Sequence, residues 1–134
     1  MVPIPQSAGA APGAGPEFGP NVIVFDPTMD TGVIEATANS LWLQQRDAEM
    51  GSDRYSLLFM PGEYGTDADP LQIAVGYYTE VAGLGASPDD VRINGKVEVF
   101  NRCFDAPDRP NYVDPDRQCF ALNNFWRSIS NLTI

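Results

Sequence analysis

One stretch of the chain has the hydrophobic spacing of a helix, and only short strand patterns follow it. Ile34, Ala38 and Leu41 fall at steps of four and three, and Ala48 comes seven positions later. This spacing predicts an amphipathic helix of about five turns. A doubly wound sheet needs a covering helix for each crossover between parallel strands. Because no second helical pattern follows, the sequence excludes that fold.

The predicted helix has capping residues at both ends. Asp30 or Thr31 is placed to cap its amino end, and Gly51 stands where a left-handed carboxyl-terminal cap is expected. The polar side chains of the other face are predicted to be solvated. They are Glu35, Asn39, Gln44, Asp47 and Glu49.

The strand patterns are separated by turn residues. Residues 22–25 are continuously apolar, as are residues 55–60 apart from Ser56, whereas later segments alternate apolar and polar side chains. Val75, Val99 and Leu122 are spaced twenty-four and twenty-three residues apart, within the range of periods found in stacked repeats. A sandwich and a parallel β-helix both fit these patterns.

Asparagines at the predicted strand ends suit the turns of a parallel β-helix, because asparagine tolerates a positive φ. They are Asn94, Asn101, Asn124 and Asn131. Each coil of such a fold hydrogen-bonds to the coils before and after it, and its apolar ends must be covered. The amphipathic helix is therefore expected to cover the amino end of the stack.

The first twenty residues differ in composition from the rest. They contain five Pro, four Gly and four Ala, with Glu17 as the only charged side chain. We expect residues 1–20 to form a linker or tail and residues 21–134 to form the folded unit. The segment lacks the features of a secretory signal, so a signal was removed upstream or the recorded start is internal.

Charge and residue usage exclude several functions. Eighteen acidic residues against eight basic ones give a formal charge of −10, which argues against a nucleic-acid partner. The chain has no histidine, so Ser/His and Cys/His nucleophiles and the usual zinc ligand are absent. No apolar run approaches the roughly 18 residues of a membrane span. We expect no membrane insertion, metal or cofactor.

The order of four motifs resembles the opening of pectate-lyase-like right-handed β-helix proteins. These motifs are residues 34–38 (IEATA) on the helix, 56–64 (SLLFMPGEY), 70–73 (PLQI) and 81–85 (VAGLG). In that family a capping helix is followed by a strand ending in Pro-Gly-x-Tyr and a first coil ending in Gly-x-Gly.

Three further segments resemble one subgroup of that family. Residues 77–88 (YYTEVAGLGASP), 124–127 (NFWR) and 130–134 (SNLTI) are similar to large secreted bacterial β-helix proteins that often carry a coagulation factor 5/8 type, or discoidin, domain. The resemblance implies a secreted, carbohydrate-active, glycoside hydrolase-like protein, of which this chain is the amino-terminal part.

With that resemblance, we predict a mainly β fold. It is the start of a right-handed parallel β-helix, with an amino-terminal capping strand and one amphipathic α-helix. Its expected partners are a polysaccharide or the remaining coils of a longer β-helix. The alternative is a non-catalytic polysaccharide-binding or structural module.

Cys103 and Cys119 are the only cysteines, and a Pro- and Asp-rich segment separates them. A disulfide closing this loop suits a secreted protein, whereas two buried thiols would suit a cytosolic one. Four carboxylates in residues 104–118 offer oxygen ligands for Ca²⁺, but their spacing matches no EF-hand, and a solvated acidic loop is the favoured explanation. They are Asp105, Asp108, Asp114 and Asp116.

Glycoside hydrolysis needs only two carboxylates on one face. Glu80 and Glu98 are the catalytic candidates, because both lie on predicted strands with side chains pointing outward, and Glu63 and Asp90 in turns are weaker. Lys96 is a candidate base for elimination, as is Arg102, although a row of surface ion pairs explains these residues equally.

Aromatic side chains are candidates for stacking on sugar rings, since Tyr and Trp combine an apolar face with a polar group. Tyr77, Tyr78 and Trp126 are the carbohydrate-binding candidates, with Phe100 and Phe125 as further possibilities. Packing in the core is the competing explanation. We expect the isolated chain to be inactive on polysaccharides and, with an uncovered final coil, to self-associate.

Overall fold

The computed structural model describes residues 18–103, 119–120 and 122–134. Within these residues there are one α-helix, one short 3-10 helix and ten short strands. In chain order these are β1 (Val22–Phe25), α1 (Thr31–Gln45), β2 (Tyr55–Phe59), β3 (Gly62–Tyr64), β4 (Leu71–Ala74), β5 (Thr79–Gly83), η2 (Pro88–Asp90), β6 (Val91–Ile93), β7 (Gly95–Glu98), β8 (Arg102–Cys103), β9 (Cys119–Phe120) and β10 (Ser128–Ser130).

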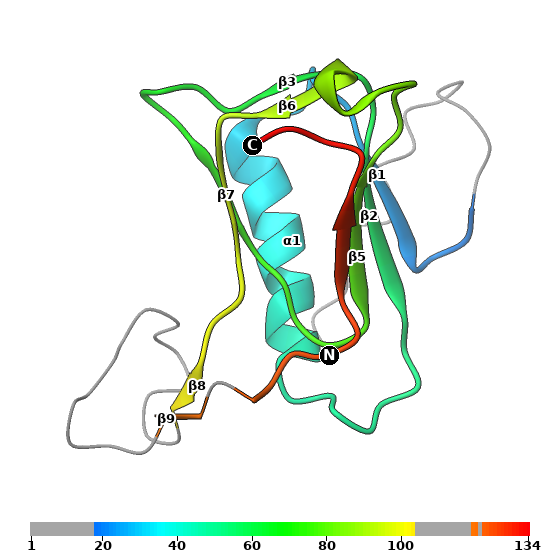
Figure 1. The fold of residues 1–134 in the computed structure, drawn as a ribbon, viewed down its shortest axis with the longest axis vertical. Helices are drawn as coiled ribbons and strands as arrows, with labels where there is room; N and C mark the ends of the chain where they lie inside the picture. The colour runs from blue at the N-terminus through cyan, green and yellow to red at the C-terminus, as the bar shows by residue number, and fades with distance from the viewer. Residues whose placement is uncertain (1–17, 104–118, 121) are drawn as a thin grey trace.

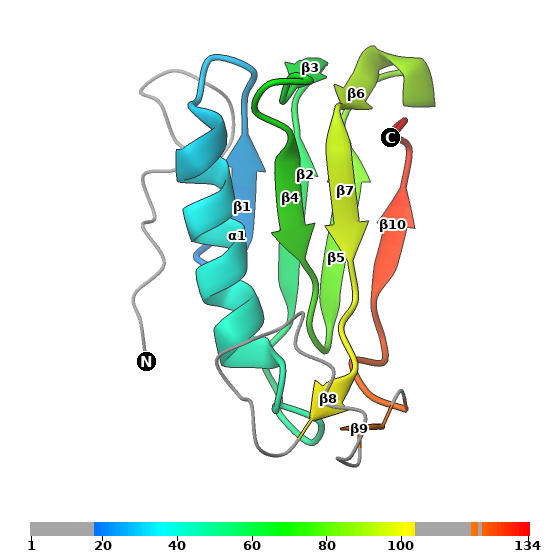
Figure 2. The same ribbon diagram turned by 90° about the vertical axis from the view of Figure 1, so that its left-hand side faces the viewer.

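The chain winds through three parallel sheets and adds one strand to each in turn. β2, β3 and β4 form one coil, and β5, β6 and β7 form the next, paired in parallel as β2 with β5, β3 with β6 and β4 with β7. β1 and β10 extend the first sheet to the order β1-β2-β5-β10. Figure 1 looks along this stack, and Figure 2 shows its layers from the side. The sandwich alternative is therefore wrong, because its sheets would be antiparallel.

The predicted period of twenty-four residues is confirmed for two of the three strand pairs of the first two coils, whereas β3 and β6 pair with a step of twenty-nine, Gly62 with Val91. Ser56 pairs with Glu80 and Leu71 pairs with Gly95, each twenty-four positions on. The second step of that period is wrong. Glu80 pairs with Ser128, forty-eight positions on, because residues 84–127 include the β8–β9 excursion.

The core lies between the sheets and α1. Alternate side chains of each strand point inward, so residues at matching positions of successive coils stack on one another. Phe25 and Phe59 are register partners in β1 and β2, with ring centroids 5.0 Å apart. Tyr64 packs edge-on against Phe59 and donates hydrogen bonds to the carbonyls of Phe25 (3.1 Å) and Met60 (2.6 Å).

The helix takes the place that a strand would have beside β4. α1 lies at one end of the stack in Figure 2, in the same layer as β1. Glu35 Oε1 accepts a hydrogen bond from the Gln72 amide (2.7 Å), and Asn39 Oδ1 accepts one from the Ala74 amide (3.0 Å). The prediction that Glu35 and Asn39 belong to a solvated face is therefore wrong, since both bind the edge of β4.

The helix ends differ from the prediction. α1 stops at Gln45, with Arg46 as its carboxyl-terminal cap, and Gly51 does not adopt a left-handed conformation. Asp30 is the amino-terminal cap, but its side chain makes no capping hydrogen bond. The side-chain amide of Gln45 donates to the Tyr77 carbonyl (3.1 Å), which ties the end of the helix to the start of the second coil.

The asparagine turns are confirmed in part. Asn124 and Asn131 have positive φ angles, whereas Asn94 and Asn101 do not. Asn131 also donates hydrogen bonds to the carbonyls of Gly83 and Gly85, both at 2.8 Å.

In the part of the chain that the structure describes, no helix combines the length and apolarity needed to cross a membrane. The linker predicted for residues 1–20 falls largely outside the described residues and stays a prediction.

Candidate functional site

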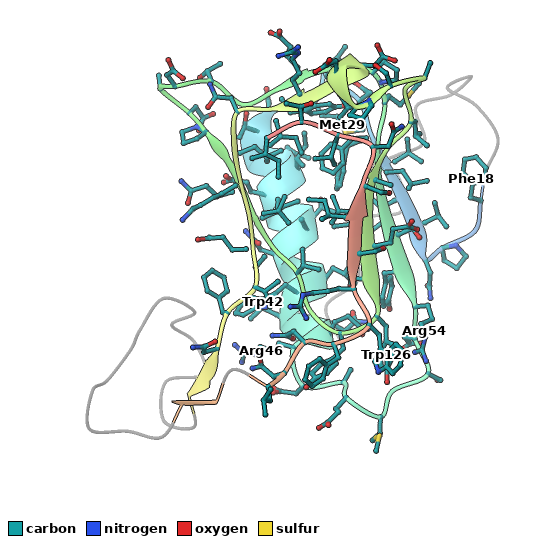
Figure 3. All side chains as sticks on the ribbon, in the orientation of Figure 1. Phe18, Met29, Trp42, Arg46, Arg54 and Trp126 are labelled. Atoms are coloured by element: carbon teal, nitrogen blue, oxygen red, sulfur yellow. The ribbon has the colours of Figure 1, made fainter. Side chains whose placement is uncertain are left out.

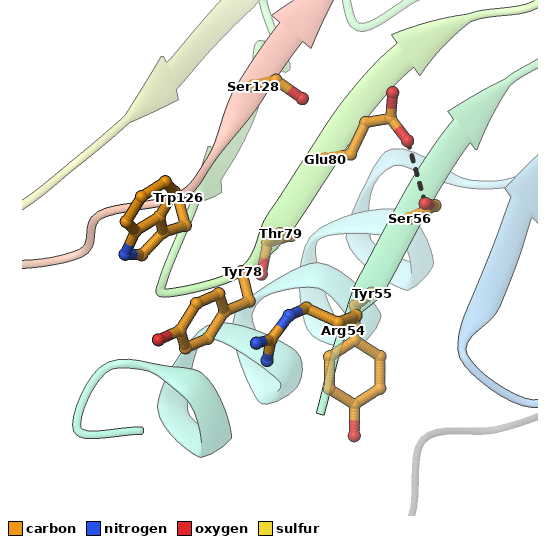
Figure 4. A pocket seen from close by; sticks show the side chains of 8 residues that line it. All are labelled: Arg54, Tyr55, Ser56, Tyr78, Thr79, Glu80, Trp126 and Ser128. Carbon is orange, nitrogen blue, oxygen red and sulfur yellow. Dashed lines mark hydrogen bonds between the residues drawn. The ribbon is translucent and has the colours of Figure 1, made fainter. Parts of the chain in front are cut away.

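A hollow of ≈ 600 Å³ lies on the outer face of the four-stranded sheet, where its strands begin. Figure 4 shows the side chains around it, which come from three successive strands and the turns that lead into them. They are Arg54, Tyr55, Ser56, Tyr78, Thr79, Glu80, Trp126 and Ser128.

The aromatic part of the hollow consists of Tyr78 and Trp126. The guanidinium carbon of Arg54 lies 3.6 Å from the ring centroid of Tyr78, a cation–π contact. The Tyr78 hydroxyl donates to the Glu49 carbonyl (2.6 Å), so this ring is held at both ends. Trp126 is 78% exposed, and Tyr78 lies between it and Arg54 in Figure 4. Figure 3 shows Trp126 and Arg54 at the same end of the molecule.

The polar part of the hollow contains one carboxylate among the residues that line it, Glu80. Glu80 Oε2 accepts a hydrogen bond from the Ser56 hydroxyl (3.0 Å). Burial first, and then the charge of Asp53, raises the pKa of Tyr55, although a hydrogen bond from Gln44 (2.6 Å) opposes the shift. Tyr55 is therefore a neutral phenol at neutral pH. The site holds one acid and no second carboxylate beside it.

The structure does not bring the two predicted catalytic acids together. Glu80 lies on β5, whereas Glu98 lies on β7 in a different sheet and forms an ion pair with Lys96 (2.7 Å). Glu63 is exposed on β3, and Asp90 accepts a hydrogen bond from the Ser87 amide (2.9 Å) in its own turn. The side chain of Arg102 lies outside the described residues.

The aromatic candidates divide between the interior and the surface. Tyr77 is only 4% exposed and packs edge-on against Phe125, so it offers no free face to a sugar. Phe100 packs edge-on against Trp42 on α1. Of the three predicted carbohydrate-binding residues, the structure therefore places Tyr78 and Trp126 in the hollow.

The two cysteines lie opposite each other in the backbone register. Cys103 of β8 pairs with Cys119 of β9 in a two-stranded antiparallel ladder. The disulfide itself stays a prediction. The carboxylates Asp105, Asp108, Asp114 and Asp116 lie outside the described residues, and within those residues no cluster of three or more metal-ligating side chains is present.

Sequence reasoning missed five residues of the hollow, among them Tyr55 and Thr79, which are buried. Arg54, Ser56 and Ser128 carry no recognisable motif by themselves. The coil period was the signal that could have found two of them, since Arg54 and Ser56 stand twenty-four residues before Tyr78 and Glu80. Ser128 is displaced from that period by the β8–β9 excursion.

A second hollow, of ≈ 430 Å³, lies at the opposite end of the stack from α1. Its lining is largely apolar and comes from the last coil and the turn before β10. Val75, Val97, Val99, Phe125, Trp126, Arg127, Ser128 and Ile129 line it. Val99 and Ile129 are exposed there.

The chain is similar to a protein of known activity and to solved structures from the same organism. No family model matches the chain. It is 37% identical over 130 residues to an exo-β-1,3-glucanase of Streptomyces sp. strain SirexAA-E, an alignment that covers 97% of this chain and 18% of the glucanase.

Two solved structures from the same organism match the fold. The structure of sacteLam55A has a TM-score of 0.65 and 34% identity, and a variant of sacteLam55A in complex with glucose has a TM-score of 0.64 and 37% identity. Each match covers 88% of this chain and 18% of the solved one. The chain thus spans less than a fifth of the length of these relatives, and it is homologous to a segment of a Streptomyces exo-β-1,3-glucanase.

Proposed function

We propose that this chain forms the capped first coils of a right-handed, pectate-lyase-like parallel β-helix in a glycoside hydrolase that acts on β-1,3-linked glucan. The observation that carries the proposal is the alignment of 97% of the chain with 18% of an exo-β-1,3-glucanase. The winding of the chain through three parallel sheets supports the β-helix, because each coil contributes one strand to each sheet. The matched glucanase does not bear on a discoidin-type domain, which stays a prediction.

The unequal ends of the stack support a role as its first part. At one end α1 covers the core and binds the edge of β4, whereas the other end carries an apolar hollow. In this proposal further coils cover the part of that hollow formed by Val97, Val99 and Ile129, leave the outer face at Trp126 open, and continue the sheets from β7 and β10.

The described residues supply no complete catalytic pair. Glycoside hydrolysis by two carboxylates needs them about 5 to 9.5 Å apart across the scissile bond. Glu80 stands without a second carboxylate in the hollow, and Glu98 lies in another sheet. The catalytic acids of the whole enzyme therefore belong to later coils in this proposal, and the segment supports them by capping the stack.

A segment exchange tests this function. The matched 18% of the Streptomyces exo-β-1,3-glucanase is replaced by this chain, and glucose release from a β-1,3-glucan is measured. We expect the chimera to hydrolyse the glucan and the chain alone to release nothing. A matched chimera with Val97→Asp should lose activity, because the charge falls where the next coil would pack. A soluble, folded chimera without activity would contradict the proposal, as would hydrolysis by the chain alone.

A non-catalytic polysaccharide-binding module is the second candidate function. The observation that favours it is the exposed Trp126 beside Tyr78 on the outer face of the sheet. Here glucan binding by the chain would be its whole contribution, and the chimera would be inactive while still binding glucan.

We also propose that the protein is secreted and that Cys103 and Cys119 form a disulfide. The antiparallel register of β8 and β9 supports the disulfide, because it sets the two cysteines directly opposite each other. Alkylation under denaturing, non-reducing conditions tests the bond in protein recovered from an oxidising compartment. Neither cysteine should react before reduction, and labelling of both thiols would refute the disulfide.

A further inference from the structure

Two rows of side chains run along the stack on the outer face of the four-stranded sheet. Ser56, Glu80 and Ser128 are register partners in the adjacent strands β2, β5 and β10. The residue two positions before each of them is Arg54, Tyr78 and Trp126. These three residues stand just before β2, β5 and β10, and they line the same hollow as the first row. Adjacent strands are about 4.8 Å apart. The two rows together line the hollow of Figure 4.

We infer that these two rows form a subsite for a β-linked glucan, which lies along the stack and stacks a glucose ring on Trp126. The inference rests on the proposed function and assigns a binding site to the outer face of this segment. Over three strands the rows extend for about 10 Å, so they offer an extended surface and not a pocket for a single atom group.

The aromatic row is held in an unusual backbone conformation. Tyr78 and Trp126 both have positive φ angles, 54° and 60°, although neither is a glycine or an asparagine. Such conformations are strained in bulky residues and cluster at ligand-binding positions. Here they set two aromatic side chains side by side, and Trp126 keeps a large apolar face in contact with solvent. Tryptophan stacks well on the apolar face of a pyranose ring.

The polar side chains of both rows have groups that can bind sugar hydroxyls. One oxygen of Glu80 accepts the Ser56 hydroxyl, and the other has no hydrogen bond among the described residues. Arg54 is fixed by the carbonyls of Gly51 (2.9 Å) and Asp53 (3.0 Å) and by the Tyr78 ring. A carboxylate acceptor, a hydroxyl and a guanidinium beside an apolar face are what a carbohydrate site combines.

Tryptophan fluorescence tests this subsite on the full chain. The protein has two tryptophans, of which Trp42 is only 7% exposed, so a change caused by added sugar reports mainly on Trp126. Titration with β-1,3-linked glucose oligomers should give a saturable change. α-1,4-linked glucose oligomers at the same concentrations should give a change at least about tenfold weaker, and equal binding of both would overturn the assignment.

Calorimetric titration of variants then locates the site. Trp126→Ala should weaken oligomer binding at least about tenfold, and Glu80→Gln should weaken it several-fold. The matched controls are Phe18→Ala, another exposed aromatic, and Glu98→Gln, another strand carboxylate, and both should bind as the parent does. Circular dichroism checks that each variant keeps its fold.

The outcomes separate the subsite from the proposed function. No binding by the parent chain at millimolar oligomer overturns the subsite, as does undiminished binding by Trp126→Ala. Neither result affects the segment exchange, whose measure is hydrolysis by the chimera. An inactive chimera with intact, Trp126-dependent binding would overturn the proposed function and leave the subsite standing.

Discussion

The two ends of the coil stack differ in whether their apolar side chains and strand edges are covered. At the α1 end, the edge amides of Gln72 and Ala74 bind side chains of the helix, and Ile34 and Leu41 fill the space above the core. At the β10 end, the apolar side chains of Val99 and Ile129 are exposed around a hollow. The α1 end is covered, whereas the β10 end has the exposed apolar side chains of a surface that other protein covers.

The difference shows how a helix can replace a strand. Glu35 and Asn39, four residues apart, lie on one side of α1 and are neighbours on its surface. Their oxygens stand where the carbonyls of a preceding strand would be, and they bind the amides of Gln72 and Ala74, which are two residues apart on β4. One helix thus satisfies the edge of a sheet and covers the core without offering a new edge.

The largest expected effect comes from emptying the covered end. Leu41→Ala removes a side chain that is 1% exposed, and the free energy of unfolding should fall by about 2–5 kcal/mol. The matched control is Leu43→Ala on the same helix, where the side chain is 49% exposed and the change should stay within about 0.5 kcal/mol. Urea denaturation compares the two, and equal losses would mean that α1 does not cover the core.

Removing an edge cap should have the next largest effect. Asn39→Ala leaves the buried Ala74 amide without its acceptor, at a cost of about 1–3 kcal/mol. Asn39→Asp keeps an oxygen at that position and should recover most of the loss. Thermal unfolding of both variants distinguishes the capping hydrogen bond from simple packing, because packing alone would not be restored by the aspartate.

Tyr64 connects β1, in the layer of α1, with the turn after β2. Burial, and to a lesser extent the charge of Asp26, raises the pKa of Tyr64 far above its usual value of 10. The unfolded chain loses this proton first as the pH rises. The stability that the neutral phenol contributes is therefore fully present below pH 10 and is lost as the pH rises above it.

Tyr64→Phe checks this alkaline dependence. At pH 7 the variant should lose about 1 kcal/mol, because two carbonyls lose a donor. Its free energy of unfolding should then fall less steeply than that of the parent between pH 9 and about pH 11. Identical slopes in urea titrations across that range would contradict the assignment.

The smallest effect on stability is expected at the uncovered end. Ile129→Asp changes an exposed side chain and should alter the free energy of unfolding by no more than about 0.5 kcal/mol. We expect the parent chain to self-associate below about 100 µM, and Ile129→Asp should associate less than the parent. Leu84→Asp is the control, since Leu84 is also exposed but does not line the hollow. Sedimentation that shows a monomeric parent would refute the expected association.

The repeating features of the fold could be predicted from the sequence, and the irregular ones could not. Ile34, Ala38 and Leu41 marked the helix because periodic burial leaves a periodic pattern. The roles of Glu35 and Asn39 were missed, since a polar residue that faces solvent and one that binds a strand edge look the same in a single sequence.

The candidate site shows the same limit. Tyr78 and Trp126 were found by residue type, but Tyr77 was wrongly grouped with them. Adjacent residues of an extended chain point to opposite faces, and Tyr77 is buried beside Tyr78. Ser128 was missed because the long excursion between β7 and β10 breaks the period of the coils. Glu98 was paired with Glu80 because strand patterns do not reveal which of three sheets a strand joins.

Amide hydrogen exchange gives the most direct test of a stack with one covered and one uncovered end. The carbonyls of Asn94 and Glu98 point toward β4, so the amide of Val97, between them, points to the free edge of β7, where the described residues offer it no acceptor. In the monomeric chain, the Ala74 amide should exchange at least about tenfold more slowly than the Val97 amide. Asn39→Ala should abolish the difference. Equal protection of the two amides in the parent monomer would contradict the account.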